Sequence, residues 1–333
     1  MKTTTTTKKK ITRGISKDFA KAFKQSELYE LYGKHKDELF IGVRNNYLNL
    51  YYNCDSIAKI EYKKRDRKIV CEIDKYYLDG NHYNSKEKVK RYKIEQSEIC
   101  KQYKVIKKHS NAKVTPEKKA QSKLALLNNN NKESNWFCID VEYIKQFSSK
   151  QEKKEADFNG RFDIIALSKT KPHKVALIEL KYGNGAIGGK SGIFKHVVDF
   201  NKFCDKGFFE SHLKQEIIEI VKSQKELGIS VPIESPEEFD KLTPVFYFII
   251  LDNNAEKENA STPKQTMAGY LFKKKRWECK RLSTKDTVES KFGDITRKDN
   301  KFYVTFLFSK ATLDNIEITD IIDGGYDERI IPE

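Results

Sequence analysis

Two short apolar segments that carry charged residues, 161–167 and 175–181, constrain this chain more than any other feature. Their high content of isoleucine, leucine, valine and alanine is typical of strands that are buried on both faces. Isolated charges are costly in such strands unless they serve a purpose. Apart from Arg161 at the start of the first segment, the charges in these segments are Asp163, Glu179 and Lys181, and we therefore predict that these three are functional.

The spacing of these charges predicts a single site. Residues two apart on a strand point to the same face, so Glu179 and Lys181 project together. If the two strands pair as a hairpin, Asp163 reaches the same edge of the sheet. Two carboxylates there can hold a hard divalent cation, Mg²⁺ or Mn²⁺. A neighbouring lysine can orient or deprotonate a water molecule, or stabilise charge that develops on a phosphate.

The elements around this site are predicted from periodicity and turn residues. Thr115, Pro116 and Glu117 are typical of the start of a helix, which we expect to end near Leu127 before a loop-like run of asparagines. The expected order is then strand, strand, strand, helix, helix, strand. The predicted segments are strands 136–147, 160–167 and 174–182, helices 191–203 and 210–227, and strands 244–251 and 301–308.

This order, with Asp163 on the second strand and Glu179-Leu180-Lys181 on the third, resembles the PD-(D/E)xK, or restriction-endonuclease-like, superfamily over about residues 136–251. The resemblance implies an α/β (mixed α+β) core with a mixed central sheet flanked by helices. It also implies hydrolysis of phosphodiester bonds, with Asp163 and Glu179 as metal ligands and Lys181 as the catalytic lysine. One departure is that Phe162 stands where proline is common.

Members of this superfamily often add an acidic residue upstream and a polar residue on the following helix. Glu142, which alternation places on the same face as Asp140, is the favoured acidic candidate, and Glu117 is the other. For the helix, His196 and Lys195 are further catalytic candidates.

A second interpretation concerns residues 184–191, which follow a strand, precede a helix and end in Gly-Lys-Ser like a phosphate-binding P-loop. The P-loop pattern requires glycine at position 184, where Asn184 stands, so an NTPase is the weaker hypothesis. Lys190 is then a candidate for contact with a nucleic-acid phosphate.

The basic charge is confined to the first part of the chain. Residues 1–135 hold 32 Lys and Arg and 16 Asp and Glu, and the remainder holds 32 of each. We expect a flexible basic tail over 1–14, a basic antiparallel β-rich module over 15–111 and the nuclease-like domain over 112–333. Basic residues interleaved with tyrosines suit nucleic acids. The candidate nucleic-acid-binding residues of this module lie in one predicted turn: Lys63, Lys64, Arg65 and Arg67.

Composition limits the remaining function classes. The six cysteines form no C-x-x-C pair, which argues against a zinc knuckle or a disulfide framework, and no apolar run has the length of a membrane span. We expect a cytoplasmic DNA nuclease of restriction, phage defence or repair, with DNA favoured over RNA. A catalytically silent nucleic-acid-binding protein is the alternative, and a homodimer or an activating partner protein remains open.

Overall fold

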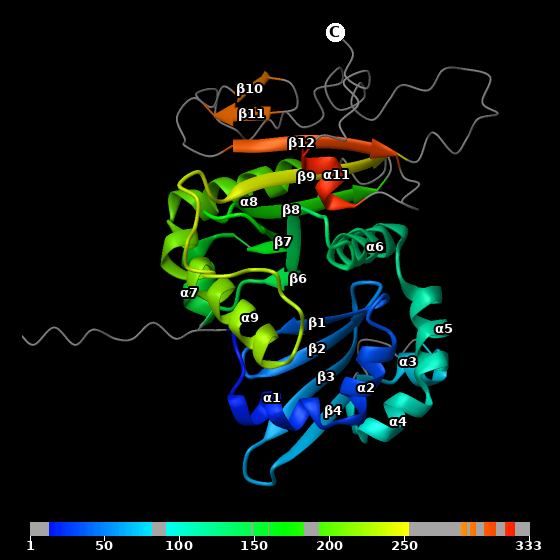
Figure 1. The fold of residues 1–333 in the computed structure, drawn as a ribbon. Coiled ribbons are helices and arrows are strands. Elements are labelled where there is room, and N and C mark those ends of the chain that lie inside the picture. The colour runs from blue at the N-terminus through cyan, green and yellow to red at the C-terminus, as the bar shows by residue number, and fades with distance from the viewer. Residues whose placement is uncertain are drawn as a thin grey trace, which may run out of the picture.

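The computed structural model describes residues 13–81, 91–147, 149–158, 160–182, 193–252, 288–291, 294–297, 303–310 and 317–323. Two β-sheets with helices packed around them make up this part of the chain (Figure 1). One sheet is antiparallel with five strands, and the other is mixed with seven. The predictions of a mixed α/β protein and of an antiparallel N-terminal sheet are therefore confirmed.

The N-terminal sheet has the strand order β1-β2-β3-β4-β5. Its strands are β1 (Leu39–Val43), β2 (Tyr47–Tyr52), β3 (Asp55–Lys63), β4 (Lys68–Asp74) and β5 (Arg91–Ile94). The helices in this region are α1 (Lys17–Lys24), α2 (Glu27–Lys34), α3 (Tyr76–Asp79), α4 (Gln96–Lys101) and α5 (Tyr103–Lys113). The apolar spacing over residues 17–34 predicts one amphipathic helix, whereas the structure has the two helices α1 and α2 there. Ser26 divides them, because its side chain caps the second helix by accepting a hydrogen bond from the Tyr29 amide.

The second sheet has the strand order β10-β11-β12-β9-β8-β7-β6, in which β9 runs parallel to both of its neighbours. Its strands are β6 (Trp136–Ile144), β7 (Arg161–Ser168), β8 (Val175–Tyr182), β9 (Val245–Asp252), β10 (Val288–Lys291), β11 (Asp294–Arg297) and β12 (Tyr303–Lys310). The helical segments are α6 (Pro116–Asn130), α7 (Lys150–Ala156), α8 (Ile193–Asp205), a π-helical turn (Phe209–Leu213), α9 (Lys214–Glu226) and α11 (Ile318–Asp323). The predicted elements occur in the predicted order, and the structure adds α7, β10, β11 and α11 to them.

Helix α6 begins at the predicted position and ends later than predicted. The Thr115 side chain accepts a hydrogen bond from the Lys118 amide, and Pro116 occupies the first turn. The helix continues to Asn130 because its asparagines have partners in neighbouring elements. Asn128 is fully buried and donates to the Trp136 carbonyl at 2.8 Å. Asn129 likewise pairs with the Cys138 backbone.

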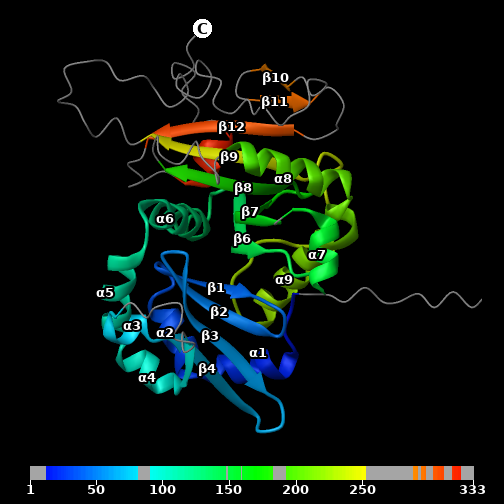
Figure 2. The same cartoon turned by 180° about the vertical axis from the view of Figure 1, so that it is seen from behind.

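Helices cover both faces of the second sheet (Figures 1 and 2). On one face Leu124 and Ala125 of α6 pack with Ile178 and Leu180 of β8. On the other, α8 and α9 join a larger apolar cluster that also includes buried residues of the N-terminal sheet. The two sheets thus share one hydrophobic core. Within the part of the chain that the structure describes, no helix is both long and apolar enough to cross a bilayer.

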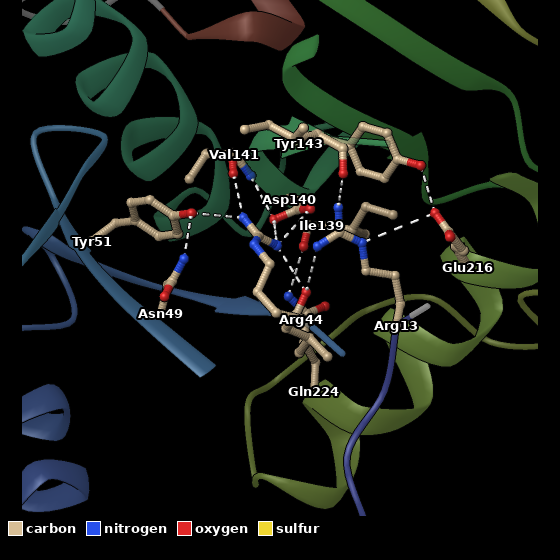
Figure 3. A network of polar contacts seen from close by, with 12 residues as sticks. Arg13, Arg44, Asn49, Tyr51, Ile139, Asp140, Val141, Tyr143, Glu216 and Gln224 are labelled. Carbon is tan, nitrogen blue, oxygen red and sulfur yellow. Dashed lines mark hydrogen bonds and ion pairs between the residues drawn. The ribbon is translucent and has the colours of Figure 1, made fainter. Parts of the chain in front are cut away.

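A buried polar network also joins the two sheets (Figure 3). Arg44, directly after β1, donates to the Asp140 carboxylate of β6, while Arg13 donates to the Ile144 carbonyl at 2.7 Å. Arg13 is 4% exposed, and Gly14 forms a β-bridge with Asn45. These two residues belong to the segment predicted as a flexible tail, and for them that prediction is wrong, because burial and backbone pairing hold them in place. Residues 1–12 lie outside the described part.

Candidate functional site

The candidate site lies where strands β7 and β8 stop pairing. Their antiparallel ladder ends at Ile164 and Ile178, and the next residues along the strands are Asp163 and Glu179. The Asp163 carboxylate reaches across to β8 and accepts a hydrogen bond from the Leu180 amide at 2.8 Å. The predicted hairpin is thereby confirmed, and it brings Asp163 to the strand that carries Glu179 and Lys181.

Glu179 is bound by two nitrogen groups. The Lys181 Nζ atom lies 2.6 Å from Glu179 Oε1, and the side chains of both residues are about 5% exposed. From helix α8, His196 Nε2 lies 3.1 Å from the same oxygen. Lys195, the other candidate on α8, has an exposed side chain. Of these two candidates, His196 is the one that contacts the site.

Helix α6 contributes two polar residues from its first turns. Glu117 accepts a hydrogen bond from the Tyr182 amide at 3.3 Å. Gln121 donates to the Asp163 carbonyl at 2.6 Å, and it is 1% exposed. Sequence analysis missed Gln121, although its spacing of four residues from Glu117 places both on one face of the helix.

Asp140 and Glu142 have different surroundings, so the prediction that simple alternation puts them on one face is wrong. The β6 register shifts between Cys138 and Asp140, and Glu142 has a φ of +53°. Asp140 is fully buried and pairs with Arg44 in the junction between the sheets. Glu142 instead lies 3.5 Å from the Lys118 ammonium on α6. A positive φ is costly for glutamate, and such strain is concentrated at functional sites.

Burial and repulsion from neighbouring carboxylates raise the pKa values of the two carboxyls at the site, while the carboxyls raise the pKa of Lys181. Burial and the neighbouring Glu179 raise the pKa of Asp163 well above its usual range. Burial also raises the pKa of Glu179 to about 7, although Lys181 opposes the shift. For Lys181, burial alone would lower the pKa, but Glu179 and Asp163 outweigh it and raise the pKa. Lys181 therefore stays a cation at neutral pH.

The donor chemistry of the site can be compared with that of a metal site. In the residues that the structure describes, no group of three or more His, Cys, Asp or Glu side chains is arranged to hold a metal ion. Asp163 and Glu179 nevertheless offer the oxygen donors that Mg²⁺ and Mn²⁺ prefer. Glu117 and Glu142 add negative charge that raises the pKa of Glu179. The donor set thus fits a hard divalent cation in its chemistry.

The candidate nucleic-acid contacts predicted from the sequence lie elsewhere. Lys63 ends β3, and Lys64, Arg65 and Arg67 lie in the turn between β3 and β4, at the end of the N-terminal sheet that is far from β7 and β8 (Figure 1). Lys63 is paired there with Glu61. Lys190 and the rest of the P-loop-like segment lie outside the described residues.

The tyrosines of the N-terminal region serve packing more than the sequence suggested. Five of them are at most 8% exposed: Tyr51, Tyr52, Tyr76, Tyr77 and Tyr103. Their rings are buried against the sheet and its helices, which excludes them from stacking on bases in this fold. For these five residues, packing accounts for the tyrosines.

The structure thus gathers Asp163, Glu179, Lys181, His196 and Glu117 around the splayed end of β7 and β8. Comparisons with protein-family models, with curated proteins and with solved structures found no match. The chemistry of these residues is therefore the basis for assigning a function.

Proposed function

We propose that this protein is a metal-dependent nuclease that hydrolyses phosphodiester bonds, with DNA as its substrate and a restriction-endonuclease-like core formed by α6, β6–β9 and α8. The observation that carries the proposal is the meeting of Asp163 with Glu179 and Lys181 across two strands whose pairing ends at that point. A buried cluster of like charges whose pKa values are raised is typical of functional sites.

Asp163 and Glu179 would hold Mg²⁺ or Mn²⁺. When bound, the cation would act as a Lewis acid and stabilise negative charge on the scissile phosphate. The hydrogen bond from the Leu180 amide fixes one Asp163 oxygen and leaves the other available. Gln121 restrains the backbone of the same residue through its carbonyl. The chain thereby holds the carboxylate in position before any ligand arrives, which lowers the cost of binding.

Lys181 acts as a cation in this proposal. Its raised pKa favours a role in stabilising the charge that develops on the phosphate, and disfavours proton abstraction. Its contact with Glu179 keeps the ammonium at the end of β8. His196 contacts the same Glu179 oxygen and positions that carboxylate from α8.

The test compares wild type with Asp163→Asn and with Asp157→Asn. Asp157 is a matched control, because its side chain is 75% exposed and its φ of +53° suits asparagine. Plasmid, linear duplex, single-stranded DNA and RNA are incubated with Mg²⁺, Mn²⁺ or EDTA. We expect metal-dependent cleavage of DNA that Asp157→Asn retains and Asp163→Asn loses by at least about 100-fold.

Other outcomes of this experiment decide against the proposal. Cleavage that persists in EDTA, or in Asp163→Asn, would show that the site is not the nuclease. Binding of DNA by the wild type without cleavage under any condition would favour the catalytically silent binding protein. Cleavage of RNA alone would keep the site and change the substrate.

A further inference from the structure

The solvent face of helix α5 is basic and has no acidic residue. No Asp or Glu occurs between Glu98 and Glu117 in the sequence. Lys104, Lys108 and Asn111 are exposed, and their spacing of four and three residues places them on one face of α5. We call the exposed side chains of Lys104, Lys108, Asn111 and Lys119 the α5 ridge.

The ridge lysines differ from their neighbours in having no acidic partner. Lys107 pairs with Glu38, and Lys113 lies 3.5 Å from Asp55. In contrast, neither Lys104 nor Lys108 forms an ion pair with any described residue. Among the described residues no ion pair offsets these two charges, and both residues are exposed, where they attract polyanions.

The ridge leads to the candidate active site. Lys119 Nζ donates to the Asn111 carbonyl at 2.9 Å, which connects α5 to the start of α6. Two residues before Lys119, Glu117 contacts the end of β8. Both views of the fold place α5 next to α6, on the side of the molecule where β8 ends (Figures 1 and 2).

We propose that the α5 ridge binds the phosphate backbone of a DNA duplex and guides one strand to Asp163 and Glu179. This inference rests on the proposed nuclease function and adds the surface that holds the substrate. A helix presents lysines about one turn, or ~5.4 Å, apart, so Lys104 and Lys108 can contact neighbouring phosphates of one strand. Such contacts orient a duplex without reading its sequence.

The turn between β3 and β4 is the competing surface and provides the control. It holds the cations that the sequence predicted as nucleic-acid contacts, but it lies at the end of the N-terminal sheet that is far from β7 and β8 (Figure 1). We expect a duplex bound only at that turn to contact neither the α5 ridge nor the carboxylates of Asp163 and Glu179. Lys64 and Arg65 are exposed, so neutralising them removes the same charge as neutralising Lys104 and Lys108.

The experiment compares Lys104→Gln/Lys108→Gln with Lys64→Gln/Arg65→Gln in the full chain. Fluorescence anisotropy of a labelled DNA duplex is measured in EDTA across a salt series, so that cleavage is not required. Each phosphate contact contributes about 0.9 to the slope of log K against log salt concentration. We expect the slope to become less steep by about 1.8 in the α5 variant, because two contacts are lost, and to stay unchanged in the turn variant.

The result separates the ridge from the nuclease proposal. Equal losses in both variants, or a loss only in the turn variant, would overturn the ridge. A wild type that binds through the ridge but cleaves nothing would retain it and reject the nuclease. Binding to anionic lipid vesicles that the α5 variant alone loses, with DNA binding unchanged, would assign the ridge to a membrane surface and also overturn it. Circular dichroism checks that both variants fold.

Discussion

The Arg44 guanidinium lies 2.8 Å from each carboxylate oxygen of Asp140, and both side chains are at most 4% exposed. Arg44 comes from the N-terminal sheet and Asp140 from the second sheet (Figure 3). The same guanidinium donates to the Tyr51 hydroxyl and to the Val141 carbonyl. Asp140 raises the pKa of Arg44 even though burial alone would lower it. Asp140 is therefore part of the junction between the sheets.

Removing one partner of this pair leaves the other charge buried without compensation. We expect Arg44→Met to lower the free energy of unfolding by about 3–5 kcal/mol. Urea denaturation followed by circular dichroism measures the change. Arg65→Met, at an exposed arginine in the β3–β4 turn, is the control and should change stability by less than about 0.5 kcal/mol. A small effect of Arg44→Met would show that water reaches the pair.

Asp140 and Glu142 are expected to give opposite results when their charges are removed. Glu142→Gln should lower cleavage by about 10–100-fold, as for residues that support a catalytic carboxylate, and should leave the unfolding free energy nearly unchanged. Burial already raises the pKa of Glu142, so a neutral side chain is tolerated there. Asp140→Asn should instead destabilise the protein while the remaining folded fraction cleaves normally. Cleavage rates per folded molecule and urea midpoints are compared, and equal effects of the two variants would contradict the assignment.

The difference between these two carboxylates shows where sequence reasoning reached its limit. Alternation of two residues predicts a shared face only in a regular strand. In β6 the register shift and the positive φ of Glu142 break this rule, and neither irregularity is visible in the side chains of the sequence. The order of elements along the chain and the hairpin were predictable, because the apolar runs in β7, β8 and β9 extend over whole strands.

Contacts between segments far apart in the sequence were also beyond prediction. Gln121 reaches Asp163 over 42 positions, and Arg44 reaches Asp140 over 96. Nothing local identifies such pairs, since Gln121 and Arg44 each resemble a surface residue in the sequence. The cations at 63–67, in contrast, gave a local signal that was misleading about position. Their composition suits a nucleic acid, but composition does not tell which end of a sheet a turn occupies.

The Phe162 ring, directly before Asp163 in the sequence, lies in an aromatic cluster of the core. It is 2% exposed and stacks with Tyr143 and Phe200 at 5.8 Å between ring centroids. We expect Phe162→Ala to lower the free energy of unfolding by about 3–5 kcal/mol, because it leaves a cavity. Leu242→Ala, at a 77% exposed leucine, serves as control. A loss below about 1 kcal/mol would show that the aromatic cluster can close around the gap.

The pH dependence of stability is predicted from Glu38, which anchors α5 to the start of β1. Burial would raise the pKa of this carboxyl, but hydrogen bonds from Lys107 and Tyr103 outweigh burial and lower it below the usual 4.5. The Tyr103 hydroxyl donates to Glu38 Oε1 at 2.9 Å. A carboxyl with a lower pKa in the folded state stabilises the fold above its unfolded value, and loses this effect as pH falls through its folded value.

Glu38→Gln should therefore cost about 1 kcal/mol at pH 7, and the difference from wild type should shrink once the pH falls below the usual value of 4.5. Urea unfolding of both proteins at a series of pH values between 7 and 3 measures this. Glu226→Gln, at an exposed carboxylate on α9, should show no such trend. If the Glu38→Gln difference stayed constant across the series, the anchoring of α5 would come from packing of Tyr103 and Ile106, which are both buried, and the ion pair with Lys107 would contribute nothing to it.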